Sequence, residues 1–494
     1  MGEFDLLENL PSVLPVIGLA ILAVIGLGLD LYWPEKRRRN IGYVAAAGMA
    51  ALVIVPFVFA PDPDQTAYWG GMIRHDTLAQ FFTVTVLIAG AITALMVVDL
   101  PSFHHKGEFY LLVIVSTLGA ALMAAAADLI MVFIAVETTS VPLYVLAGFR
   151  NKDAKSTESG LKYFLFGAFA SAIMLYGFSL LYGFTGQTGL HAIADYLGGP
   201  DYADQPIPVL FALVLVIVGL GFKISAVPFH FWTPDVYEGA PTPVAAYISV
   251  ASKAASFALL ARFLTAVFPN SLEIDGQTIQ SFWMQLVAAM AVLSMTLGNV
   301  LALVQTNTKR LLAYSSIAQA GYVLVGVAAI QSQTDSGVGA VAFYLFMYTF
   351  TNLLAFGVVV LVGEATGGDN IRDLAGLNRR NPLLALALTV ALLSLGGIPP
   401  AAGFFGKFFL FTAAVEADLV WLAVIGVLNS IVALYYYLVV IKVMYVDHHP
   451  DETKPLPVAH SAAWWLGITT LAVIILGVIP AAVFNWAVKG AGVL

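Results

Sequence analysis

Cysteine is absent from the 494-residue sequence. Disulfide bonds and iron–sulfur clusters with cysteine ligands are therefore excluded on this chain. Any electron transfer that accompanies its function must take place on another polypeptide, and we expect no cofactor here.

Charged residues are almost as scarce. They make up 11% of the sequence, against about a quarter in soluble domains, whereas hydrophobic residues make up 60%. Apolar runs of about 20 residues, the length that crosses the roughly 30 Å hydrocarbon core of a bilayer, recur along the whole chain. The alternating segments typical of a membrane β-barrel are missing. The composition therefore predicts an all-α polytopic membrane protein in contact with membrane lipid.

The N-terminal segment MGEFDLLENL is acidic, whereas a cleavable signal peptide begins with a basic region. We therefore expect the first apolar run to stay in the protein as a helix. The net charge of −8 gives no indication of nucleic-acid binding.

The apolar runs, separated by polar or proline- and glycine-rich breaks, predict about 14 membrane-spanning helices. No loop is long enough for a soluble domain, so we expect the function to lie within the bilayer or in contacts with other subunits. The predicted spans are 11–32, 41–60, 77–99, 108–126, 128–149, 160–184, 206–232, 243–268, 281–304, 310–331, 338–362, 383–415, 420–445 and 462–486.

Basic residues divide the loops into two sets. Alternate loops carry most of the lysines and arginines, beginning with the run EKRRRN at 35–40, whereas the opposite loops carry only Arg74 and Lys489. Short basic loops stay on the cytoplasmic side, and the predicted helix number is even. We therefore expect a multi-pass protein of a prokaryotic inner or plasma membrane, with both termini on the outer side.

Four charged residues fall well inside predicted helices, namely Glu137, Lys223, Lys253 and Lys407. A charge at the bilayer centre costs about 2.5–3.5 kcal/mol on insertion scales, so each needs a partner or water. One interpretation is a permanent ion pair between Glu137 and a lysine. The lysines outnumber the acid, however, and a desolvated lysine gives up its proton more readily because burial disfavours its charged form. The set is therefore a candidate proton path.

Two further residues carry weaker signals. His230 lies inside a predicted span, about two helical turns after Lys223. Histidine titrates near neutral pH, so His230 is a candidate relay residue, with a satisfied core histidine as the alternative. Arg262 lies near the outer end of its helix, and we expect its stem to snorkel towards the membrane surface.

Two predicted helices, the seventh and the twelfth, contain breaks. Pro228 follows Lys223 in one, and Pro399 and Pro400 interrupt the other before Lys407. Proline breaks a helix, and non-helical backbone at membrane depth persists only where it is buried in protein or lines a water-filled cavity. The broken helices are the fourth members of two five-helix units, helices 4–8 and 9–13. Units of odd helix number must be inverted, so the spacing predicts an inverted repeat with sites at the breaks.

These units divide the chain into four parts. Helices 1–3 occupy residues 1–107, and helix 14 lies within 446–494. The first five-helix repeat occupies 108–268 and the second occupies 281–445. No extramembrane catalytic module is expected.

Five stretches resemble a known family, and they cover much of the chain between residues 108 and 440. They are VETTSVPLYVLAG, KYFLFGAFASAIMLYG, GFKISAVPFHFWTPDVYEGAPTPVAAYISVASKAASF, TNTKRLLAYSSIAQAGY and GGIPPAAGFFGKF. They resemble the antiporter-like membrane subunits of respiratory complex I, a family shared with Mrp-type cation/proton antiporters. The chain length, the helix number, Lys407 and the segment SSIAQAGY favour the N-type subunits within that family.

The resemblance implies roles for single residues. Glu137 would modulate Lys223, Lys253 and His230 would form a central relay, and Lys407 would serve the exit half-channel. It also implies a proton-translocating subunit of NADH-quinone oxidoreductase, a translocase, driven by quinone reduction in other subunits. Those subunits would carry NAD, FMN, quinone and iron–sulfur clusters, and the partners would be the other antiporter-like and small membrane subunits of complex I.

Two other functions stay open. One is a Na⁺/H⁺ antiporter subunit of an Mrp-type complex, because the ion path would be shared. The other is a structural or lipid-contacting subunit whose charged residues form permanent ion pairs.

Overall fold

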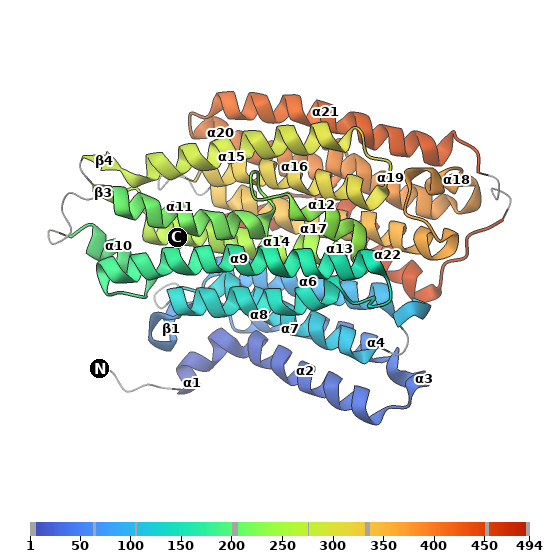
Figure 1. Ribbon diagram of the computed structural model, residues 1–494, viewed down its shortest axis with the longest axis horizontal. Coiled ribbons are helices and arrows are strands. Elements are labelled where there is room, and N and C mark those ends of the chain that lie inside the picture. Colours follow the sequence, from blue (N-terminus) through green and yellow to red (C-terminus); the bar gives the residue numbers. More distant parts are fainter. Residues whose placement is uncertain are drawn as a thin grey trace.

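The computed structural model describes residues 6–62, 66–103, 106–199, 206–274, 276–330, 336–449 and 454–490. Long helices run side by side along the horizontal axis of Figure 1. Within the described ranges, 13 helices are long and apolar enough to cross a membrane. The expected fold class, an all-helical polytopic membrane protein, is confirmed.

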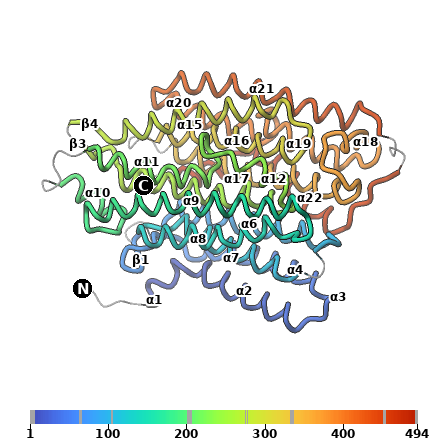
Figure 2. The backbone as a smooth tube through the Cα atoms, in the orientation of Figure 1, coloured from blue at the N-terminus to red at the C-terminus, as the bar shows by residue number. Residues whose placement is uncertain are grey.

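The N-terminal helices form one edge of the bundle, which is blue in Figure 2. Helix α6 is almost entirely buried, whereas α2 and α4 are largely exposed at the margin. The side chain of Asp76 caps α6 by accepting a hydrogen bond from the backbone N–H of Ala79, at 2.8 Å. The elements of this part are α1 (Leu6–Asn9), η1 (Leu10–Val13), α2 (Leu14–Tyr32), α3 (Glu35–Arg38), α4 (Ile41–Leu52), α5 (Val55–Val58), β1 (Ala67–Tyr68), η2 (Trp69–Gly71), β2 (Ile73–Arg74), α6 (Thr77–Val98) and η3 (Pro101–Phe103).

The next helices correspond to the first predicted repeat. A single turn of π-helix, η5, joins two α-helical segments directly before Lys253, and this whole span is buried. The elements are α7 (Gly107–Ala125), α8 (Leu129–Ala147), α9 (Ala154–Thr185), α10 (Leu190–Leu197), α11 (Pro206–Ile224), α12 (Trp232–Gly239), α13 (Thr242–Tyr247), η5 (Ile248–Ser252) and α14 (Lys253–Val267).

The remaining helices correspond to the second predicted repeat and the C-terminal part. The last predicted span, 462–486, is divided after Val478, and Pro480 precedes the short helix that follows. The elements are β3 (Glu273–Ile274), β4 (Gln277–Thr278), α15 (Ile279–Ala302), α16 (Thr308–Ala328), α17 (Ser336–Thr366), η6 (Ile371–Leu374), α18 (Leu377–Arg380), α19 (Pro382–Gly396), α20 (Ala402–Glu416), α21 (Val420–Tyr445), α22 (His460–Val478) and α23 (Ala481–Lys489).

Both predicted breaks are present, and their backbones bond in the same way. In the first, the N–H of Ala226 donates to the carbonyl of Gly221 at 2.9 Å, and in the second the N–H of Ile398 donates to Leu393 at 3.0 Å. A cis peptide precedes Pro228 and Pro400. The first break surrounds Pro228, as expected, since α11 ends at Ile224 and α12 begins at Trp232.

The two lysines beside the breaks do not occupy equivalent positions. Lys223 lies in the last turn before its break, whereas Lys407 lies seven residues after Pro400, in the second helical half. The residue seven positions after Pro228 is Asp235. Counted from the breaks, the position of Lys407 therefore corresponds to that of Asp235 and not to that of Lys223.

The basic loops gather at one end of the bundle. Ion pairs join Arg150 to Glu364 at 3.4 Å and Lys309 to Asp369 at 3.4 Å there. In Figure 1 the helices α3 and α18 lie at this end, whereas α1 and the hairpins β1 and β3–β4 lie at the other. We call these the basic end and the hairpin end.

Candidate functional site

Lys223 is buried at the end of α11, with 4% of its surface exposed. Its ammonium group donates hydrogen bonds to the hydroxyl of Ser140 and to that of Tyr144, the latter at 3.2 Å. Both hydroxyls belong to α8, and Nζ also lies 5.3 Å from the centre of the Tyr144 ring. Neutral partners therefore hold this lysine in the described structure.

Glu137 lies one helical turn before Ser140 on α8. Its carboxylate accepts a hydrogen bond of 2.6 Å from the hydroxyl of Ser171 on α9. Among the described residues, no carboxylate lies within 4.0 Å of the ammonium group of Lys223, Lys253 or Lys407. This geometry weakens the interpretation of permanent ion pairs.

Lys253 is buried in the middle of the bundle, directly after the π-helical turn. Its ammonium group donates to the backbone carbonyl of Ser316 at 2.9 Å and to the Ser316 hydroxyl at 2.5 Å. The hydroxyl of Tyr348 donates to the hydroxyl oxygen of Ser316 at 3.2 Å. Lys253 therefore connects α14 to α16 and α17.

Lys407 is buried at the second break. Nζ donates to the carbonyl of Gly396 at 3.3 Å and lies 4.3 Å from the centre of the Tyr322 ring, a cation–π distance. Gly397 has φ of 84°, and a Cβ atom there would lie 3.0 Å from the Lys407 side chain. The left-handed backbone therefore favours glycine at this position, and a larger residue would also press on the lysine.

Polar side chains fill the space between Lys253 and Lys407. Gln319 on α16 donates to the hydroxyl of Tyr437 at 3.2 Å and accepts a hydrogen bond from Tyr344. The Tyr344 ring stacks on Tyr348, which contacts the serine bonded to Lys253. On the far side, Asn299 bonds both Tyr436 and Tyr322, at 3.0 and 3.2 Å. Hydrogen bonds and ring contacts thus link the surroundings of the two lysines.

His230 lies in the loop between α11 and α12. It is half-buried, and its Nδ1 atom is enclosed without a hydrogen-bond partner among the described residues. The neighbouring side chains Pro228 and Phe231 are exposed, so this part of the loop lies at the surface of the bundle. The structure brings Glu137 close to Lys223 but brings His230 into contact with none of the lysines, and its relay role stays a prediction.

Arg262 was expected to snorkel, and that prediction is wrong. Only 1% of Arg262 is exposed, and its guanidinium group makes two hydrogen bonds to Asp76, at 2.6 and 2.8 Å, and bonds the carbonyl of Ala124. Burial alone raises the pKa of Asp76, but the charge and hydrogen bonds of Arg262 and the backbone N–H of Ala79 hold it below its usual range. Because Asp76 is buried beside Arg262, an ion pair between them is more favourable than extension of the arginine to the membrane surface.

The partners of the lysines were missed by sequence reasoning. For Ser140 and Tyr144 a signal existed, because they follow Glu137 at positions i+3 and i+7 and so share its helix face. For Ser171, the chain carries no local signal, since its contact with Glu137 joins two different helices. The same holds for the residues around Lys253, namely Ser316, Gln319, Tyr344 and Tyr348.

A cluster of charges at the basic end ties α12 to its neighbours. Lys162 bonds Asp235 at 2.6 Å, Lys155 bonds Glu238 at 2.9 Å, and Arg310 reaches both acids, at 2.8 and 3.0 Å. Burial alone raises the pKa of both carboxyls, but the hydrogen bonds from these cations outweigh it and lower both pKa values below their ordinary range. The cluster anchors the helix that follows the first break.

We expect this anchor to weaken in acid. Carboxyls with lowered pKa values stabilise the folded protein above their ordinary pKa of about 4, and this contribution is lost as pH falls through their folded pKa. The double variant Asp235→Asn/Glu238→Gln should melt at lower temperature than wild type at pH 7. The free energy lost should be no more than about 1 kcal/mol per pair, because the groups are partly exposed. Thermal unfolding of the purified assembly between pH 7 and pH 3 measures this, and the gap should close in acid.

Glu416→Gln is the matched control, since Glu416 is exposed at the end of α20. It should leave the melting temperature unchanged across the range. A double-variant defect that persists undiminished at pH 3 would contradict the electrostatic account.

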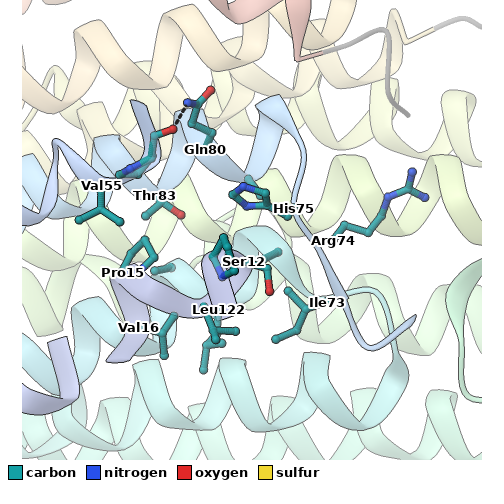
Figure 3. A pocket seen from close by; sticks show the side chains of 16 residues that line it. Ser12, Pro15, Val16, Val55, Ile73, Arg74, His75, Gln80, Thr83 and Leu122 are labelled. Carbon is teal, nitrogen blue, oxygen red and sulfur yellow. Dashed lines mark hydrogen bonds between the residues drawn. The ribbon is translucent and has the colours of Figure 1, made fainter. Parts of the chain in front are cut away.

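A cavity at the hairpin end is too small to serve as a binding site. Its volume is about 20 Å³, room for a single water molecule. Gln80, which lines this cavity, donates a hydrogen bond to the carbonyl of Pro56. Figure 3 shows the Arg74 side chain extending away from the other labelled residues. Ser12, Thr83 and Leu122 contribute to its lining, and none of the intramembrane lysines does.

No group of three or more His, Cys, Asp or Glu side chains that could hold a metal ion lies within the part of the chain that the structure describes. The polar chemistry of the bundle interior is instead that of lysines, tyrosines, serines and amides.

The bundle, its two broken helices and its buried lysines define an antiporter-like membrane subunit. Residues 126–433 match the family described as NADH:quinone oxidoreductase/Mrp antiporter, and the chain belongs to this family. It is 41% identical to NADH-quinone oxidoreductase subunit N of Moorella thermoacetica, over 95% of this chain and 96% of that protein. The resemblance expected from the motifs is therefore confirmed.

Two solved structures share the fold. A chain of respiratory complex I from Thermus thermophilus is 34% identical, with a TM-score of 0.77, over 95% of this chain and 98% of that one. A chain of the Mrp complex from Dietzia sp. DQ12-45-1b has a TM-score of 0.79 at 21% identity, over 98% of this chain and 97% of that one. The second likeness shows the fold alone.

Proposed function

We propose that this chain is a proton-translocating membrane subunit of NADH-quinone oxidoreductase, and so part of a translocase. Family membership and the whole-length likeness to a subunit N support the proposal. The observation that carries it is the set of three buried lysines, each hydrogen-bonded to neutral groups, with polar side chains connecting the surroundings of Lys253 and Lys407. Such lysines can bind and release protons, whereas lysines in permanent ion pairs would stay charged.

Protons would enter from the basic end at Lys223 and leave through Lys407. When Glu137 approaches Lys223, the charged lysine is stabilised, and when it withdraws the proton moves on towards Lys253. Opposite charges 4 Å apart interact by about 4 kcal/mol at an effective dielectric of about 20, enough to switch the protonation of a partly buried group. At the two breaks, backbone groups that lack helical hydrogen bonds would bind water. His230 would serve as a further relay.

The orientation in the membrane and the location of the cofactors complete the proposal. The basic end would face the cytoplasm of a prokaryotic cell, with both termini outside. Two inverted repeats, 108–268 and 281–445, would supply the two half-channels, flanked by the parts 1–107 and 446–494. NAD, FMN, quinone and iron–sulfur clusters would reside on partner subunits, whose quinone reduction drives the protons through this chain.

Purification of the tagged chain from its native membrane tests the assignment. NADH-oxidising subunits should co-purify with it, and vesicles containing the assembly should move protons when NADH is oxidised, without a need for Na⁺. The second candidate is the Mrp-type Na⁺/H⁺ antiporter subunit, because the matching family includes subunits of both kinds. Sodium-stimulated proton flux without quinone reduction, in an assembly that lacks NADH-oxidising subunits, would select that candidate.

A further inference from the structure

One face of α8 carries three polar side chains in a row. Glu137, Ser140 and Tyr144 lie at positions i, i+3 and i+7, so they share the face that packs near Lys223 and α9. Ser140 and Tyr144 are bonded to Lys223, whereas Glu137 is bonded to Ser171. The acid and the lysine thus occupy separate sites along one stripe.

Glu137 and Lys223 lie near each other along this stripe. Ser140 lies three residues from Glu137, about 4.5 Å along the helix axis, and the lysine ammonium group sits on Ser140. No ion pair within 4.0 Å joins Glu137 to Lys223 in the described ranges. In this arrangement Glu137 bonds Ser171 and not Lys223, and a carboxylate released by Ser171 is free to approach the lysine.

Ser171 is well placed to hold the acid. Only 6% of it is exposed, and its hydroxyl donates to the Glu137 carboxylate at 2.6 Å, the length of a charge-assisted hydrogen bond. One turn away on α9, a Cβ atom at Gly167 would lie 2.2 Å from the Tyr144 hydroxyl. The two helices therefore approach closely here, which places the short serine side chain within reach of Glu137.

We propose that Ser171 is a positioning residue that holds Glu137 away from Lys223. Exchange of Glu137 between Ser171 and Lys223 then sets when the lysine keeps its proton and when it releases it. This inference rests on the proposed function, since it assigns a cause to the movement of Glu137.

The variant Ser171→Ala in the intact assembly tests it. Loss of a hydrogen bond to a charged group should shift Glu137 towards Lys223 on the order of tenfold or more. NADH-driven proton translocation should fall several-fold, with normal assembly, because the lysine is held charged. Ser171→Thr keeps the hydroxyl and should restore most of the translocation.

Ser159→Ala is the matched control on the same helix. Ser159 is equally buried, and its hydroxyl bonds the backbone carbonyl of Val236 at 3.0 Å, away from the lysines. It should leave translocation unchanged. In a Glu137→Gln background, adding Ser171→Ala should cause no further loss, because the carboxylate that the serine restrains is gone.

The outcomes separate this inference from the proposed function. Wild-type translocation in Ser171→Ala, alongside its loss in Lys223→Ala, would overturn the positioning role and leave the function standing. Normal translocation in both variants would overturn the function itself. If Ser171→Thr is as defective as Ser171→Ala in an assembled complex, the hydroxyl is not what positions Glu137, and the inference is also overturned.

Discussion

Lys223→Ala is expected to stop most NADH-driven proton translocation while the assembly still forms. The lysine is 4% exposed, and within the described part of the chain it is bonded only to neutral hydroxyls. Alanine therefore removes the group that carries the proton without leaving a buried carboxylate unpaired. Removal of a positioned proton donor lowers rates on the order of a hundredfold or more. Purified complex in sealed vesicles, with an internal pH dye and NADH as electron donor, measures the effect.

Lys223→Arg separates a proton carrier from a structural cation. Arginine keeps the positive charge but does not release its proton at ordinary pH, so a carrier role predicts a loss as complete as with alanine. A purely structural role predicts that the arginine variant retains translocation. Retention in an assembled, electron-transferring complex would therefore refute the proposed path.

Lys442→Ala is the control for loss of a lysine as such. Its side chain is 65% exposed, and its contact with Asp447 is a surface pair at 3.7 Å, worth about 1 kcal/mol at most. Translocation should match wild type. A defect comparable to that of Lys223→Ala would mean that general changes of charge, rather than the buried path, explain the result.

The apolar runs were sufficient to locate the helices, because each spanning segment must shield its backbone with about 20 apolar residues. Helix α21 begins and ends as predicted, at Val420 and Tyr445. Within the predicted span 206–232 the first helical part ends at Ile224, although residues beyond it, including Phe229 and Phe231, remain apolar. Apolar sequence places a segment in the membrane but does not decide whether its backbone is helical there.

The charged site residues could also be found from the sequence, since a lysine in an apolar run stands out. Their partners could not, because serine, tyrosine and glutamine are common in membrane helices and their contacts form between distant segments. Lys253 and Ser316 are 63 residues apart in the chain. The contact between Asp76 and Arg262 joins residues 186 apart, and no local pattern indicated it.

Breaking that contact should have the largest effect on stability. Arg262→Ala leaves Asp76 buried, with 0% of its surface exposed, and among the described residues it then keeps one ionic partner, Arg74 at 3.5 Å. Removing one partner of a buried ion pair costs about 3–5 kcal/mol. The assembly should contain far less of this subunit, or melt at much lower temperature, as measured by native electrophoresis and thermal unfolding.

The double variant Asp76→Asn/Arg262→Met tests the cause. It removes both charges but keeps an amide oxygen that can cap α6, and methionine fills much of the space of the arginine stem. We expect it to be more stable than Arg262→Ala alone, because the cost of the single variant comes from the uncompensated carboxylate rather than from lost attraction. Because the pKa of Asp76 is lowered in the folded state, the pair should stabilise the subunit at neutral pH and weaken only in strong acid. Equal losses in the single and double variants would show instead that the guanidinium bond to the Ala124 carbonyl holds this end of the bundle together.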